Sequence, residues 1–210
     1  MEKSGKNTRE IKKRLLNGDL LIWRLLGVFM DLVFVSLLWL VCSLPLITIG
    51  AAAAAAYDTV VHSIKRKEPG LAARFFATFK AELLRGALCT VVWALALALL
   101  MLLLVYVISL GDSPMSFIFL VNAIVLGVVV LGSLVWVFPM LGRFRMSAGR
   151  TMTTALRLVF ARLPATLAMA LALVFTAAVC FLWLFPLIVM PGLMWYFQAG
   201  FIEPAFSQYS

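Results

Sequence analysis

Charged residues, and acidic ones above all, are scarce in this chain of 210 residues. Only 13% of the residues are charged, with 9 Asp plus Glu against 18 Lys plus Arg, while 64% are hydrophobic. A soluble domain typically has about 25% charged and about 45–50% apolar residues. The composition therefore excludes an ordinary water-soluble enzyme and indicates a protein embedded in a lipid bilayer.

Metal ligands and reactive thiols are equally sparse. The three cysteines, Cys42, Cys89 and Cys180, each lie inside an apolar run and have no partner at ligand or redox spacing. They are expected to be small hydrophobic residues rather than disulfide partners. The single histidine, His62, has no suitable ligands nearby. We therefore predict neither a metal site nor any other cofactor.

Catalytic motifs are also missing. The chain has no phosphate-binding glycine loop, no Ser/His/Asp set and no pair of carboxylates at a useful spacing. We therefore predict that the protein is not an enzyme, and a membrane enzyme is the least favoured class of function.

Long apolar runs dominate what is present, and a membrane span needs roughly 20 apolar residues. Four runs are long and almost free of charge: 25–49, 86–110, 116–141 and 165–189. Two weaker segments are 50–64, which is rich in alanine, and 193–206, which is short and aromatic. The sequence thus predicts an all-α, polytopic membrane protein with five or six spans in a single membrane domain, 1–210.

The basic residues predict the orientation, because Lys and Arg tend to stay on the cytoplasmic side. They cluster at 3–14, 65–85 and 143–162. All three clusters share one side only if 50–64 crosses the membrane. We therefore expect it to cross, with the basic N-terminal segment, 1–20, in the cytoplasm. The formal charge of +9 then indicates topology rather than nucleic-acid binding. The crossing of 193–206 stays open, since no Lys or Arg follows Arg162.

Two of the basic segments have the pattern of an amphipathic helix. Their apolar stripes are Leu71, Phe75, Phe79 and Leu83 in 71–85, and Met152, Leu156, Val159, Phe160 and Leu163 in 150–162. The basic residues off these stripes include Arg74, Lys80, Arg85, Arg150 and Arg157. We expect both segments to lie along the inner leaflet, with the basic residues facing lipid head groups or a partner protein.

Ionisable residues inside apolar segments are candidates for function, because charge is costly in lipid. Asp31 lies in the first apolar run, and Asp58 and His62 lie one helical turn apart in the alanine-rich segment. One explanation for these residues is structural: Asp31 forms an ion pair with Arg24, and Asp58 forms one with either His62 or Lys65. The functional alternative is a proton or cation relay through Asp31, Asp58 and His62.

The sequence Leu-Pro-Leu-Ile-Thr-Ile-Gly at 44–50 predicts a tight turn between the first two spans. Pro45 breaks the first span, because proline disrupts a continuing helix. Thr48 is expected to cap the next helix, and Gly50 to permit a sharp reversal of the chain.

These motifs resemble the YesL-like family, bacterial membrane proteins with a domain of unknown function. The resemblance extends from about Leu15 to Phe206, with Ser36 where members often carry Asn and Ala51 where they often carry Pro. It rests on Leu38-Trp39-Leu40, the 44–50 turn, Tyr57, Arg74-Phe75-Phe76, Phe79-Lys80, the run from Phe138 to Phe144, and Ala155-Leu156. Genes of the family often lie near genes for carbohydrate uptake. The resemblance therefore implies an accessory role in sugar import at the bacterial inner membrane, with permease or ATPase subunits of an ABC transporter as partners.

Two hypotheses follow. The leading one is an accessory or scaffold membrane protein linked to carbohydrate uptake, which contacts the lipid bilayer and a partner but no nucleic acid. The alternative is a small transporter or channel-like protein that uses Asp31 and Asp58. A polar cavity at mid-membrane would favour transport, whereas a packed core with a groove at the cytoplasmic end would favour a partner protein. The substrate and the oligomeric state are not determined by the sequence.

Overall fold

A computed structural model describes residues 23–111, 113–144, 146–183 and 185–206. Every regular element in these ranges is a helix, which confirms the all-α prediction. Five helices there are long and apolar enough to cross a membrane: Trp23–Cys42, Leu46–Lys65, Leu71–Ser109, Pro114–Arg143 and Leu163–Leu182. The chain therefore has the helices of an integral membrane protein. The predicted cytoplasmic segment, 1–20, lies outside the described residues.

The first helix, Trp23–Cys42, ends earlier than the sequence predicted. A 3-10 turn, η1 (Leu46–Thr48), leads from it into α2 (Ile49–Thr59). The turn at Pro45 is present, but Thr48 does not cap α2 through its side chain. Its hydroxyl instead donates to the carbonyl oxygens of Cys42, at 2.6 Å, and Pro45, at 2.7 Å. Thr48 thus ties the end of the first helix to the turn, which corrects its predicted role.

Gly50 also has a different role from the predicted one. It lies inside α2, and a Cβ atom there would collide with Thr90, Phe138 and the backbone of Gly86. The absence of a side chain therefore permits close packing of α2 against α3 and α4. The reversal of the chain is made by the preceding residues, Ser43 to Thr48.

The α2 helix lies at the centre of the molecule and continues as one π-helical segment, η2 (Val60–Lys65). Every residue from Gly50 to Thr59 is buried. The alanine run 51–56 lets other backbones approach closely, because small side chains allow tight packing between membrane helices. A Cβ atom on Gly86 would lie 2.6 Å from the Ala51 nitrogen, and one on Gly142 would lie 2.5 Å from the Ala54 oxygen.

The α3 helix (Leu71–Ser109) is a single helix of 39 residues, which corresponds to about 58 Å. The sequence predicted two parts, a surface helix over 71–85 and a span over 86–110. The amphipathic pattern is real, but its apolar face packs inside the protein, where Phe75 is fully buried and stacks on Phe79. Because this part continues straight into the long apolar part, 71–85 is not the separate surface helix that the sequence predicted.

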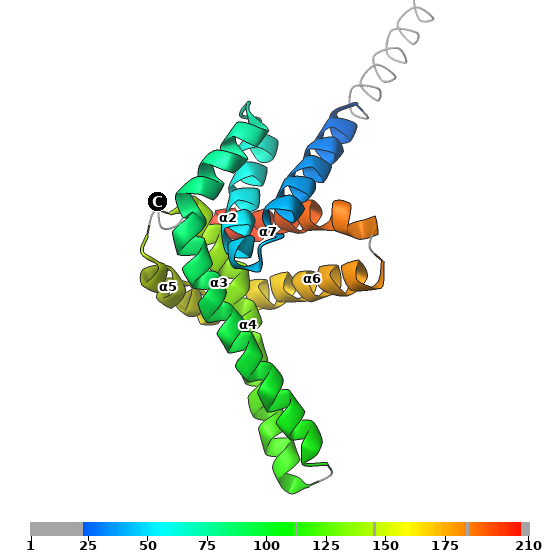
Figure 1. Cartoon of the computed structure of the whole chain (residues 1–210), viewed down its shortest axis with the longest axis vertical. Helices are drawn as coiled ribbons and strands as arrows, with labels where there is room; N and C mark the ends of the chain where they lie inside the picture. Colours follow the sequence, from blue (N-terminus) through cyan, green and yellow to red (C-terminus); the bar gives the residue numbers. More distant parts are fainter. Residues whose placement is uncertain (1–22, 112, 145, 184, 207–210) are drawn as a thin grey trace, which may run out of the picture.

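The remaining helices are α4 (Pro114–Arg143), α5 (Ala148–Ala161), α6 (Leu163–Leu182), the 3-10 turn η3 (Phe185–Ile188) and α7 (Met190–Phe206). The α3 and α4 helices form a long hairpin whose tip projects away from the other helices, while α6 runs across α4 and α7 packs against α6 and α2 (Figure 1). The weak segment 193–206 is thus helical as part of α7, which has 17 residues.

The α5 helix is the short amphipathic helix that the sequence predicted, but its buried face is rotated from the predicted stripe. The buried residues are Thr151, Ala155, Leu158 and Val159. Leu156 and Phe160, which belong to the apolar stripe that was expected to face the inner leaflet, are 39% and 61% exposed and so are accessible to lipid. This buried face of α5 packs against the end of α4, and the opposite side of the helix carries the exposed Leu156 and Phe160.

Two helix starts are capped by hydroxyl groups from other helices. The Gly50 amide donates to Thr90 Oγ1 at 3.0 Å, and the Gly192 amide donates to Ser36 Oγ at 2.8 Å. Each hydroxyl also donates to the carbonyl oxygen four residues earlier in its own helix. The first amides of a helix have no partner within it, and lipid cannot supply one. These contacts therefore stabilise the chain breaks before α2 and α7.

Candidate functional site

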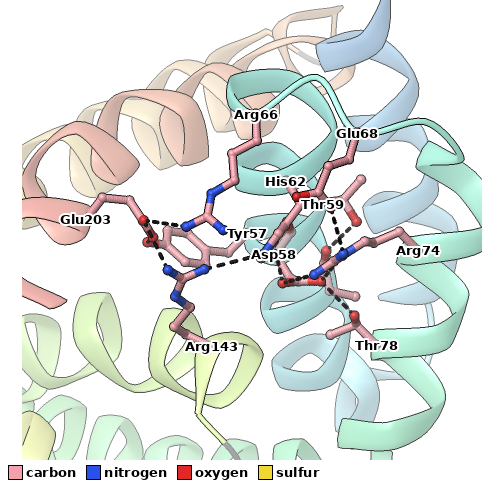
Figure 2. Close-up of polar contacts among 11 residues, drawn as sticks. Tyr57, Asp58, Thr59, His62, Arg66, Glu68, Arg74, Thr78, Arg143 and Glu203 are labelled. Carbon is pink, nitrogen blue, oxygen red and sulfur yellow. Dashed lines mark hydrogen bonds and ion pairs between the residues drawn. The ribbon is translucent and has the colours of Figure 1, made fainter. Parts of the chain in front are cut away.

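The carboxylate of Asp58 is the centre of the polar contacts at one end of the bundle (Figure 2). It lies on α2 and its side chain is only 5% exposed. Arg74 of α3 binds it with two nitrogens, at 2.8 and 3.3 Å, and Thr78 donates to it at 2.8 Å. His62 Nδ1 lies 2.9 Å from the same carboxylate. Asp58 is therefore a fully paired buried anion that joins α2 to α3.

Glu203, near the end of α7, is the second anion in this region. It accepts a hydrogen bond from the Tyr57 hydroxyl at 3.3 Å. Arg66 and Arg143 form ion pairs with it at 3.4 and 3.5 Å. Because Tyr57 lies on α2, Arg66 directly follows η2 and Arg143 ends α4, Glu203 anchors α7 to the central helix and to the end of α4.

His62 connects the two anionic centres. Its Nε2 atom lies 3.4 Å from Arg143 Nη1, and its Nδ1 atom lies 3.0 Å from the Asp58 carbonyl oxygen. An arginine can only donate, so Nε2 must be the acceptor and the proton belongs on Nδ1. This network fits a neutral imidazole that donates to Asp58 and accepts from Arg143.

We call this set the polar cluster. Its members are Tyr57, Asp58, His62, Arg66, Glu68, Arg74, Thr78, Arg143 and Glu203. Three arginines balance three carboxylates, and Glu68 completes the set through an ion pair with Arg74 at 3.1 Å. With a neutral His62 the polar cluster has no net charge. Its charges therefore bind α2, η2, α3, α4 and α7 to one another.

A cavity of about 350 Å³ lies beside the polar cluster. Its polar wall includes Asp58, Arg74, Thr78, Glu82 and Arg143. This volume is near the lower end of the range for small-molecule sites. The cavity lies where α2, α3 and α4 carry their charged residues, whereas residues 86–109 of α3 and 114–142 of α4 include no charged residue.

A second cavity, of about 380 Å³, lies among the apolar parts of the helices. It is lined by aromatic and aliphatic side chains, including Trp39, Trp93, Phe138 and Trp195. Of the residues that the structure describes, no charged one lines it. Among the described residues, no group of three or more His, Cys, Asp or Glu side chains could hold a metal ion.

The structure brings together only two of the three acidic and histidine candidates. Asp58 and His62 are in contact, but Asp31 is exposed on the first helix and is not a member of the polar cluster. Arg24, the predicted partner of Asp31, is exposed as well. A relay through all three candidates therefore has no continuous set of contacts in the described part of the chain.

The predicted basic residues divide into internal and exposed ones. Arg74 pairs with Asp58, and Arg85 pairs with Glu82 and donates to the Met146 carbonyl oxygen at 3.1 Å. These two arginines make contacts within the chain instead of facing lipid. The other three, Lys80, Arg150 and Arg157, are exposed, as a lipid-facing or partner-facing role requires.

Sequence reasoning missed Arg66, Glu68, Thr78, Arg143 and Glu203 as members of the site. One signal was available, because Glu203 is the only acidic residue after Asp112. An isolated charge in an apolar stretch needs a partner. Spacing was a second signal, since residues four apart, such as 74 and 78, share a helix face.

Comparison with protein families gives one match. Residues 32–104 match the model described as "Protein of unknown function, DUF624". The search of curated proteins and the search of solved structures find no match. The matched region includes Asp58, His62 and Arg74 but neither Arg143 nor Glu203. About a third of the chain is thus similar to an uncharacterised domain family, and the long apolar helices fit an integral membrane protein of unknown activity.

Proposed function

We propose that the protein is an accessory or scaffold membrane protein, and that the end of the bundle with the polar cluster carries its partner-binding surface. The observation that carries this proposal is the internal pairing of the cluster. Its charges join five helical elements and so make a rigid platform. The cavity among the apolar helices has no charged lining, which argues against a polar path across the membrane.

The surface around this platform is basic. Lys80 on α3 and Arg150 on α5 are exposed and lie on elements that pack against each other. Such residues suit an acidic surface on a partner, because opposite charge guides association. In this proposal the N-terminus and the polar cluster face the cytoplasm of a bacterial cell, in agreement with the tendency of Lys and Arg to remain there. The resemblance to the YesL-like family supports a partner in carbohydrate import, such as the permease or ATPase subunits of an ABC transporter.

Co-purification tests the proposal. The tagged full-length protein is extracted from native membranes in a mild detergent, and the proteins that elute with it are identified by mass spectrometry. We expect permease or ATPase subunits with the wild type and at least a fivefold loss in the double variant Lys80→Glu/Arg150→Glu. Arg24→Glu, an exposed arginine on the first helix, is the matched control and should retain them. Recovery of the protein alone from the wild type would contradict the proposal.

A small transporter is the second candidate, and one observation favours it. Asp58, a buried acid, lines the cavity of about 350 Å³ beside the polar cluster. In proteoliposomes this candidate requires solute or proton flux that is lost in Asp58→Asn. Equal flux in the wild type and in the variant would exclude it, and so would the absence of flux from a correctly folded wild type.

A further inference from the structure

A groove of about 410 Å³ runs between the end of α4 and the side of α5. Its floor is formed by Met140 and Leu158, which are almost completely buried. Met146, Thr154 and Arg157 line its sides, and Arg157 is exposed. The groove therefore combines an apolar floor with one guanidinium group at its edge.

The charged residues of the segment that contains this groove are all arginines. The segment 143–162 contains five arginines and no Lys, Asp or Glu. The guanidinium group of arginine binds phosphate through two parallel hydrogen bonds, whereas lysine offers only a point charge. Arg157, which lines the groove and is exposed, is therefore suited to bind a phosphate group.

The position of the groove favours a lipid over a soluble ligand. The α5 helix ends at Ala161, the backbone turns at Arg162, and the apolar α6 helix begins at Leu163. Head groups lie at the level where such a helix enters the hydrocarbon layer. The exposed Leu156 and Phe160 flank Arg157 on α5, a mixture of apolar and basic residues typical of a helix at a membrane interface.

The walls of the groove are held in place. Arg85 of α3 donates to the Met146 carbonyl oxygen at 3.1 Å, and the Met146 amide donates to the Phe144 carbonyl oxygen at 2.9 Å. The short connection between α4 and α5 is thereby fixed to α3. Methionine side chains themselves are flexible and adapt to irregular apolar ligands. A fixed backbone with adaptable side chains suits an acyl chain.

We propose that this groove binds one anionic phospholipid, with an acyl chain on Met140 and Leu158 and the phosphate at Arg157. The lipid would fill the space between α4 and α5 where the chain enters the bilayer. This inference is independent of the accessory role proposed above, because it concerns another ligand and the groove at Arg157, which Lys80 and Arg150 do not line.

Native mass spectrometry of the full chain tests the proposal. The protein in detergent is mixed with equal amounts of phosphatidylglycerol and phosphatidylcholine, and the retained lipid is counted. We expect one phosphatidylglycerol to be retained in preference to phosphatidylcholine. Arg157→Gln should lower this preference about fivefold, since one basic residue near anionic lipid contributes about that factor. Arg150→Gln, on the same helix but outside the groove lining, should keep it.

Two further arms test the acyl chain. Ala161→Phe places a large side chain in the groove and should reduce retention without changing the charge. Inorganic phosphate should not displace the lipid at millimolar concentration. The proposal is overturned if both lipids are retained equally, if Arg150→Gln acts as strongly as Arg157→Gln, or if inorganic phosphate competes fully. If the preference for phosphatidylglycerol is lost only when a partner protein co-purifies, the groove binds that protein instead of a lipid.

Discussion

Two apolar helices of equal length show how this protein uses its sequence. The segments Leu46–Lys65 and Leu163–Leu182 each have 20 residues, with mean hydropathy 1.2 and 2.4. In the most apolar stretch of each segment, 78% of the residues of the less apolar segment are buried, but only 11% of those of the more apolar segment. In a soluble protein the order would be reversed. Here lipid is the solvent, so the more hydrophobic of the two helices faces outwards and the alanine-rich helix with its polar residues occupies the centre.

The comparison teaches that close packing, rather than hydrophobicity, holds the centre together. Lipid tails are as apolar as leucine, so helices associate through van der Waals contact and hydrogen bonds. The alanines of α2 provide the contact, and Asp58, His62 and the Gly50 amide provide the bonds. The following substitutions test this explanation, from the largest expected effect to the smallest.

Gly86→Ala should have the largest effect. Its Cβ atom would lie 2.6 Å from the Ala51 nitrogen, so α2 and α3 would have to move apart. Overpacking of this kind costs about 1–3 kcal/mol and occasionally more, and we expect the upper end here because the Cβ atom would meet backbone atoms of Ala51. Thermal unfolding in detergent measures the loss. Gly27→Ala is the control, because nothing lies within 4 Å of that Cβ position, and it should be neutral or slightly stabilising. Equal stability of the two variants would contradict a tightly packed centre.

Asp58→Asn should have the next largest effect. It leaves Arg74 without its main anionic partner, and breaking a buried ion pair costs about 3–5 kcal/mol. Since the Arg74 side chain is 34% exposed, solvent should reduce the loss to about 2 kcal/mol. Denaturant titration in detergent measures it. The matched control is Asp31→Asn, on the exposed face of the first helix, and a similar loss there would exclude a special role for the polar cluster.

Thr90→Val tests the cap on α2. It removes the acceptor for the Gly50 amide while keeping the shape of the side chain, and loss of a cap costs about 1 kcal/mol. Thr90→Ser retains the hydroxyl and should restore most of the stability. Thr153→Val, at an exposed site on α5, should leave the unfolding temperature unchanged. A loss in the serine variant as large as that in the valine variant would show that methyl packing, and not the cap, is responsible.

Leu171→Ala should have the smallest effect. This residue on α6 is 69% exposed, so lipid replaces most of the contacts that are lost. We expect a change within about 0.5 kcal/mol, as for surface substitutions in general. Val60→Ala removes a smaller group from a fully buried position next to α2 and should cost more, about 1 kcal/mol. Unfolding temperatures of the two variants rank them directly. A larger loss in Leu171→Ala than in Val60→Ala would contradict the explanation that the centre is tightly packed and that α6 faces lipid.

The fold was largely predictable because each span is a local property of the sequence. The runs 25–49, 86–110, 116–141 and 165–189 all overlap helices that are long enough to cross a bilayer. The errors occurred where an interaction between helices replaced a local rule. Thr48 and Gly50 have the residue types of a cap and a turn, yet other contacts determine their roles. The 71–85 segment is amphipathic, but its apolar face packs on protein and not on lipid.

The site was only half predictable for the same reason. The pairing of Asp58 with His62 follows from a spacing of four residues on one helix. Its other partners, Arg74 and Thr78, come from the next helix. Glu203 follows Tyr57 by 146 residues, so their contact depends entirely on how α7 returns to α2. No periodicity within a segment contains that information.

The amino-acid sequence by itself determined that this is an all-helical membrane protein, because charged residues are scarce and the apolar runs are long enough to span a lipid bilayer. Only the tertiary structure decided which helix lies inside. Small residues permit a central position but do not require it, since burial depends on which backbones can approach one another and which charges find partners. The two acids Asp58 and Asp31 differ accordingly, because Asp58 pairs with Arg74 from the neighbouring helix α3 and Asp31 remains at the surface.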